Sequence, residues 1–312
     1  MKVAFPPLSL AMKFYTFEDP KQLGLEFRGR LIDWAAAAAE LCPAKRADVP
    51  AGMLAMLRSW DAGLAAANDL LVRLATLGAA TDAKPWSHAL DRITLLAPVP
   101  RPGKILCSGI NYRSHLHENP GARLPTEPFF FAKMPSAVIG PGAPIMLPTQ
   151  SRQVDYEVEF AVVIGRTMKH TPNDEVMRCI AGYTILHDVS ARDVQFKDNQ
   201  ITLGKNFDTF CPMGPCLVTC DEIPDPSGLG LRSYVNGEIM QNGSNADWVF
   251  PLTKLLGFLS QVMTLEPGDV VSTGTPAGVG LFRPTPLFLG PGDVVRLEID
   301  GIGALENPVT GH

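Results

Sequence analysis

Acidic and apolar residues alternate along residues 154–164, which read VDYEVEFAVVI. A period of two predicts a β-strand, because successive side chains of a strand point to opposite faces. Asp155, Glu157 and Glu159 would then share one face, where their carboxylates repel each other unless a cation lies over them. Carboxylate oxygens suit hard divalent cations such as Mg²⁺, Mn²⁺ and Ca²⁺. A solvated acidic face is the alternative, but the apolar end of the run, residues 162–164, indicates burial on both faces and favours a metal site.

A histidine and a glutamate three positions apart follow the short apolar run that ends at Leu106. If Asn111 caps a helix, then Asn111, His115 and Glu118 fall on one face of that helix. The carboxylate would orient the imidazole and stabilise its protonated form, so the pair could act as a general base. The alternative is a surface ion pair without a role. His117 is expected to lie exposed on another face.

Two single polar residues lie beside apolar runs. Asp188 follows the run 183–187, where it could supply a third metal ligand or cap a helix. Lys205 is isolated among apolar and small residues. It is either a surface lysine with a buried stem or a cation that stabilises a developing enolate.

A glycine-rich loop, TGTPAGVG at residues 273–280, follows a predicted strand. Its backbone N–H groups and the Thr275 hydroxyl could hold a carboxylate. It is not a phosphate loop, since no Lys-Ser/Thr follows the last glycine, and it does not open the helix that a dinucleotide site requires. A magnesium-dependent phosphoryl-transfer enzyme is therefore disfavoured.

The elements that must position these residues divide the chain in two. Periodicity predicts strands at 13–18, 25–32 and 93–96, a helix at 34–41, and one or two further helices within 52–77. The proline-rich segment 98–103 is the predicted boundary between an N-terminal α+β domain, 1–98, and a catalytic domain, 99–312. In the second domain, Asn236-Gly237 and Asp300-Gly301 predict hairpin turns, and one helix is expected at 248–263.

Composition limits the classes of function. With 312 residues, 46% hydrophobic and 19% charged, the chain is typical of a globular protein. A net charge of −5 without a Lys/Arg cluster argues against a nucleic-acid surface, and no apolar run reaches membrane-spanning length. Residues 1–12 lack the features of a signal peptide, and the six cysteines lack zinc-site spacing, so reduced thiols in the cytoplasm are expected.

Together these segments resemble the fumarylacetoacetate hydrolase family over residues 103–310. The motifs occur in order: GINY at 109–112 with His115 and Glu118, DYEVE at 155–159, DVSARDVQ at 188–195, GKNFDTF at 204–210, NGE at 236–238 and GTPAGVG at 274–280. The resemblance implies a mostly β fold with some α, a mixed β-sandwich roll with the site in its mouth, usually as a homodimer. The chain departs from the family pattern beside the site, at His187 and Asn206.

The resemblance also implies roles for particular residues. Magnesium or manganese, with calcium as a further candidate, would be held by Glu157, Glu159 and Asp188. Asp155 matches a position that the family does not use for ligation, so it is expected to hydrogen-bond nearby groups. The remaining implied roles are catalytic for His115 and Glu118 on a lid-like segment and for Lys205 at the substrate oxygen, and substrate-contacting for Arg192, Gln195 and Thr275.

The expected function is metal-dependent hydrolysis of a C–C bond in a 1,3-dicarbonyl acid, such as an acylpyruvate or a fumarylacetoacetate-like acid. Decarboxylation, dehydration, hydration and isomerisation of a related 2-oxo acid are alternatives, because each passes through an enolate that the same residues could stabilise. A catalytically silent protein that binds small acids is the alternative from another class. The expected partner is a small 2-oxo or 1,3-dicarbonyl acid, with neither nucleic acid nor membrane.

Overall fold

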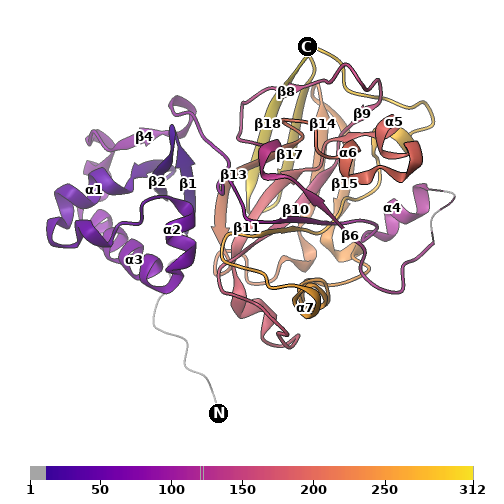
Figure 1. Ribbon diagram of the computed structural model, residues 1–312. Coiled ribbons are helices and arrows are strands. Elements are labelled where there is room, and N and C mark those ends of the chain that lie inside the picture. Colours follow the sequence, from indigo (N-terminus) through magenta and orange to yellow (C-terminus); the bar gives the residue numbers. More distant parts are fainter. Residues whose placement is uncertain (1–11, 120, 122, 312) are drawn as a thin grey trace.

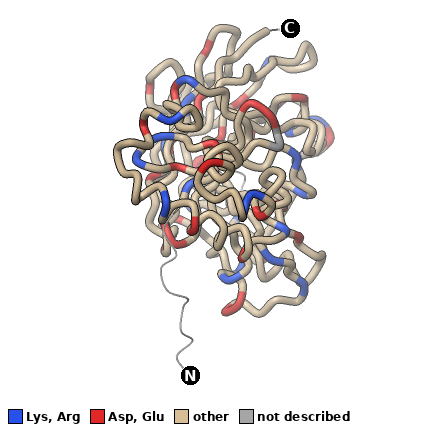
Figure 2. The backbone as a smooth tube through the Cα atoms, turned by 90° about the vertical axis from the view of Figure 1, so that its left-hand side faces the viewer, with Lys and Arg blue, Asp and Glu red and all other residues tan. Residues whose placement is uncertain are grey.

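The computed structural model describes residues 12–119, 121 and 123–311. The expectation about a signal peptide concerns residues that lie almost entirely outside this range. In Figure 1 the elements up to β4 (Ser87–Ala89) lie to one side of a larger, strand-rich part. Figure 2 shows acidic and basic residues interspersed along the backbone. None of the helices in the described part of the chain is long and apolar enough to span a membrane.

The N-terminal part is an antiparallel sheet with helices packed against it. Its elements are β1 (Lys13–Phe17), β2 (Asp19–Phe27), β3 (Arg30–Asp33), β4, α1 (Trp34–Leu41), α2 (Met53–Arg58) and α3 (Trp60–Leu77). The expected strand at 25–32 is in fact two strands, because Arg28 and Gly29 both have positive φ and turn the chain back. The expected strand at 93–96 is only an isolated bridge between Phe17 and Leu95.

One sheet runs through the whole molecule. Its eleven strands include β1, which pairs with β13 (Cys211–Thr219), and β13 is followed in order by β11 (Ile180–His187) and β10 (Val158–Ile164). On the far side of β10 lie β16 (Val270–Ser272), β5 (Ile105–Ser108) and β6 (Phe130–Lys133). The sheet thus contains strands from both sides of the proline-rich segment, which stays a predicted domain boundary.

A second sheet of five strands covers the central part of the first. It consists of β15 (Glu238–Ser244), β14 (Gly230–Val235), β17 (Val294–Ile299), β18 (Gly303–Thr310) and β8 (Ile145–Met146). Phe160 and Tyr183 of the long sheet share a core with Leu231 and Leu297 of the short one. Both predicted hairpins are present, and α7 (Leu252–Val262) confirms the predicted helix in shortened form. The expected strand-rich fold with some α is therefore confirmed.

The acidic run 154–164 is not one continuous strand. β9 (Val154–Asp155) pairs with β12 (Ser190–Ala191), whereas β10 pairs with β11, and residues 156 and 157 lie between them. Side-chain oxygens take the backbone N–H groups at the break: Asp155 Oδ1 accepts from Tyr156 N at 2.8 Å, and Gln241 Oε1 accepts from Val158 N at 3.0 Å. The predicted burial is confirmed, because every residue of β10 is buried, which excludes the solvated face.

Candidate active site

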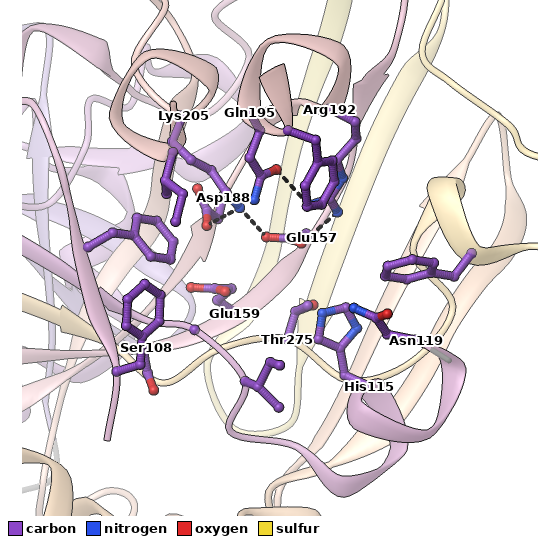
Figure 3. A pocket seen from close by; sticks show the side chains of 17 residues that line it. Ser108, His115, Asn119, Glu157, Glu159, Asp188, Arg192, Gln195, Lys205 and Thr275 are labelled. Carbon is purple, nitrogen blue, oxygen red and sulfur yellow. Dashed lines mark hydrogen bonds and ion pairs between the residues drawn. The ribbon is translucent and has the colours of Figure 1, made fainter. Parts of the chain in front are cut away.

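The predicted site residues meet in one open pocket, which has about 710 Å³ of empty space with its mouth included. Figure 3 shows His115 and Asn119 on the side of the pocket opposite Lys205. Glu157, Glu159 and Asp188 are buried on its floor, and the rim includes the half-exposed rings of Phe129 and Phe196. Of the predicted set, all but Glu118 line the pocket: His115, Glu157, Glu159, Asp188, Arg192, Gln195, Lys205 and Thr275.

Glu157 is enclosed by two cations. Its Oε1 accepts from Arg192 Nη2 at 2.6 Å and its Oε2 from Lys205 Nζ at 2.7 Å. Burial opposes the ionised form, but Arg192 and Lys205 outweigh it and hold the pKa of Glu157 well below its usual range. Lys205 is 2% exposed and also donates to Asp188 Oδ2 at 2.7 Å, so it is not a surface lysine.

A second buried lysine, Lys133, was missed by the sequence reasoning. It ends β6, and its Nζ donates to Asp188 Oδ1 at 2.5 Å and to the Val189 carbonyl at 3.2 Å. Each carboxylate oxygen of Asp188 therefore has its own ammonium group. Nothing in the local sequence FFAK distinguishes this lysine from an exposed one at a strand end.

Lys133→Met is expected to lower the free energy of unfolding by about 3 kcal/mol, because it leaves the buried Asp188 carboxylate with one of its two cations. Equilibrium urea unfolding of the metal-free protein measures the change. Lys45→Met, which breaks an exposed pair with Asp69, is the control and should alter stability little. Equal effects of the two substitutions would contradict a buried counter-ion role for Lys133.

Glu159 differs from its neighbours because no ion pair reaches it within the described part of the chain. It is 2% exposed and accepts a hydrogen bond from the Ser272 hydroxyl. Burial and the nearby Asp188 and Glu157 carboxylates raise its pKa well above the usual range. A buried acid that other acids surround is the environment that a divalent cation would relieve, so the donors fit such an ion.

The candidate metal site contains a donor that sequence reasoning left without a role. Ligand atoms of Cys107, Glu159 and Asp188 all lie within 4.8 Å of one another, and all three residues are buried. Glu157 is not in this group, and its two oxygens accept from Arg192 and Lys205. The structure thus brings two of the three predicted ligands together, beside a thiol.

His115 and Glu118 form the predicted pair on α4 (Arg113–Glu118), with His115 Nδ1 2.6 Å from Glu118 Oε1. The other Glu118 oxygen accepts from Gly278 N at 2.8 Å. His117 is exposed, as expected. The expected Asn111 cap is wrong: its amide is buried and bonds to the Thr273 carbonyl at 3.0 Å and to Phe250 N at 2.8 Å.

Asp247 takes the place of the expected cap, because its Oδ2 accepts from Ser114 N at 2.7 Å. This contact joins α4 to a residue that lies 133 positions further along the chain. A local spacing rule could not find it.

The glycine-rich loop holds carboxylates, but they are the protein's own. Gly278 N donates to Glu118, and Gly280 N and Leu281 N donate to Asp155 at 2.7 and 3.0 Å. Asp155 also accepts from Arg192 Nε at 2.8 Å, so it hydrogen-bonds nearby groups as expected. The Thr275 hydroxyl donates to the Val158 carbonyl at 2.8 Å, so its hydrogen is already used within the protein.

Comparison with known proteins decides the family. The model of the fumarylacetoacetate (FAA) hydrolase C-terminal region matches residues 104–310. The chain belongs to the fumarylacetoacetate hydrolase family. This family member is 42% identical over 310 residues to the mitochondrial oxaloacetate tautomerase fahd2 of Xenopus laevis, covering 97% of this chain and 91% of that protein. It is 48% identical over 221 residues to the human mitochondrial oxaloacetate tautomerase FAHD2A, covering 70% of each.

Solved structures of fumarylacetoacetate hydrolase family members share the fold over almost the whole chain. A putative HpcE protein from Mycobacterium smegmatis has a TM-score of 0.80 and 32% identity, covering 96% of this chain and 99% of that one. Maleylpyruvate hydrolase from Sphingobium sp. SYK-6, in complex with manganese(II) and pyruvate, has a TM-score of 0.75 and 30% identity, covering 96% and 99%. The chain is thus a family enzyme with a candidate buried metal site.

Proposed function

We propose that this enzyme catalyses the keto–enol tautomerisation of a 2-oxo acid with the help of a divalent cation, and that oxaloacetate is the first substrate to test. The observation that carries the proposal is the His115–Glu118 pair, because its histidine lines the same pocket as the acidic cluster and lies across it from Lys205 (Figure 3). The curated relatives are named as oxaloacetate tautomerases, which supports isomerisation over the C–C hydrolysis expected from the sequence.

Glu159 and Asp188, which lie beside Cys107, would hold the cation, Mg²⁺ or Mn²⁺, together with Glu157, the third ligand that the family resemblance implies in the same pocket. When bound, such an ion polarises the 2-oxo group and makes the neighbouring C3 proton easier to remove. The floor of the pocket suits a bound cation, since the buried Glu159 has no ion pair of its own among the described residues.

His115 is the proposed proton carrier. Glu118 engages its Nδ1, which leaves Nε2 free to take a proton from C3 of the substrate, and the carboxylate stabilises the imidazolium that results. Lys205, across the pocket, would stabilise the negative charge that develops on the 2-oxygen. The His115 imidazolium then gives its proton to that oxygen, which yields the enol and restores the neutral imidazole, so a C–H bond breaks, an O–H bond forms and no water is consumed.

Hydrolysis of a C–C bond in an acylpyruvate is the second candidate. A second solved structure of the Sphingobium maleylpyruvate hydrolase, with 31% identity and a TM-score of 0.76, supports it. The same His115–Glu118 pair would then deprotonate a water molecule, and the leaving carbanion would be an enolate stabilised by Lys205.

Product identity separates the candidates. With Mn²⁺ and oxaloacetate, a tautomerase accelerates the interconversion of enol and keto forms, measured as enol absorbance, while the carbon chain stays intact. Pyruvate released from oxaloacetate indicates decarboxylation, and a carboxylic acid released from an acylpyruvate indicates hydrolysis. A protein that binds the acids without changing either signal would overturn the enzymatic proposal in favour of a binding protein.

Two expectations about the whole molecule stay predictions. The homodimer is tested by sedimentation equilibrium of the purified chain. The cytoplasmic location is tested by fractionation of the source cells, since the curated relatives above are named as mitochondrial proteins.

A further inference from the structure

Gln241 connects the five-stranded sheet to the break in the acidic run. It lies on β15 and is fully buried. Its Oε1 accepts from Val158 N at 3.0 Å and from Ser233 Oγ at 2.9 Å. Its Nε2 donates to Thr275 Oγ1 at 2.8 Å and to the Pro276 carbonyl at 2.9 Å. Every hydrogen-bonding position of this amide is therefore used, which fixes its orientation.

Thr275 completes the arrangement. Its hydroxyl accepts from Gln241 and donates to the Val158 carbonyl at 2.8 Å. The N–H and the C=O of Val158 are thus both held by two side chains that are bonded to each other. Val158 is the residue between Glu157 and Glu159, both of which are proposed to hold the metal.

Because Val158 lies between Glu157 and Glu159, the contacts of Gln241 and Thr275 with its backbone affect both glutamates. Residues 156 and 157 belong to neither β9 nor β10, and the Glu157 carbonyl is held by Asp188 N, which donates to it at 3.1 Å. Asp155 is anchored before the break by Gly280 and Leu281, and Val158 is anchored after it by Gln241 and Thr275. A rotation of the Val158 peptide units would change the direction of both neighbouring carboxylates.

We propose that Gln241 and Thr275 form a clamp that sets the direction of Glu157 and Glu159 for metal binding. The inference rests on the proposed metal centre. Both clamp members act through the glutamates, so they are positioning residues. Thr275 would then position the Val158 backbone, in addition to making the substrate contact expected from the sequence.

Electron paramagnetic resonance of Mn²⁺ tests the clamp on the full-length protein. Gln241→Met and Thr275→Val each remove one arm, and each is expected to weaken Mn²⁺ binding about 10- to 100-fold, as loss of a partner behind a metal ligand does. The spectrum of the bound Mn²⁺ should change with the altered ligand directions. Thr275→Ser keeps the hydroxyl and should bind Mn²⁺ like the wild type.

Ser233→Ala is the matched control, because it removes a buried hydrogen bond to Gln241 without touching Val158. It should lower the melting temperature and leave Mn²⁺ affinity unchanged. The effects of Gln241→Met and Thr275→Val should not add in the double variant, since the two arms hold one residue.

The outcomes separate the clamp from the metal centre. Wild-type protein that does not bind Mn²⁺ overturns both proposals. Wild-type binding with unchanged affinity in Gln241→Met or in Thr275→Val overturns the clamp alone, as does equal weakening by Ser233→Ala. If one arm variant fails to fold, the other, compared with Thr275→Ser, decides the question.

Discussion

Glu159→Gln is expected to abolish metal-dependent turnover while leaving the metal-free protein at least as stable as the wild type. Burial and the nearby Asp188 and Glu157 carboxylates disfavour the ionised form of Glu159, which has no ion pair in the described structure, so an uncharged amide at this position relieves the metal-free fold. Mn²⁺ affinity should fall by more than the roughly 10- to 100-fold that loss of an outer partner causes.

The experiment is decisive because Mn²⁺ affinity is expected to fall while the stability of the metal-free protein is maintained or rises. Urea unfolding in the presence of a chelator measures stability, and a Mn²⁺ titration measures affinity. Glu306→Gln, on the exposed side of β18, is the control and should change neither quantity. Wild-type Mn²⁺ affinity in Glu159→Gln would exclude this residue as a ligand, and a large loss of metal-free stability would show that the metal-free fold depends on the carboxyl group.

His115→Ala is expected to lower kcat by about 10²- to 10⁴-fold, the usual contribution of a general base. Mn²⁺ binding should persist, because His115 makes its bond to Glu118 and not to the acids of the candidate metal site. The interconversion of enol and keto forms of oxaloacetate gives kcat and KM, and the Mn²⁺ titration is run beside it.

The same helix offers the control for this substitution. His117 lies two residues further along α4 and is exposed, so His117→Ala should retain full turnover. Glu118→Gln should give an intermediate loss, since it keeps a hydrogen-bonding group at Nδ1 but loses the charge that stabilises the imidazolium. Near-normal kcat in His115→Ala would rule out its role as proton carrier, and loss of Mn²⁺ binding would show that it shapes the metal site.

Features that depend on neighbours in sequence were predicted well. The His115–Glu118 bond follows from the spacing of three on a helix, and the hairpin at Asn236-Gly237 follows from the backbone freedom of these residues. The burial of β10 follows from its consecutive apolar residues at 162–164, which leave neither face of the strand polar. In each case the physical cause lies within a few residues of the pattern.

Features that depend on distant contacts were not predictable. The strand break is stabilised by Gln241, which is 83 positions from Val158, and Asn111 bonds to residues 139 and 162 positions away in place of capping α4. Lys133 reaches Asp188 across 55 positions. The sequence could not rank isomerisation, one of the stated alternatives, above C–C hydrolysis for a chemical reason: both pass through an enolate, so one set of residues serves both.

The pairing of β1 with β13 has a consequence for the colloidal behaviour of the protein. Residues 13 and 14 occupy backbone hydrogen-bonding positions opposite residues 217 and 218. A shortened chain that begins after the proline-rich segment would leave those groups unpaired on a largely apolar strand edge, which could pair with another molecule. We therefore expect the N-terminal part to keep this edge from pairing with a second molecule.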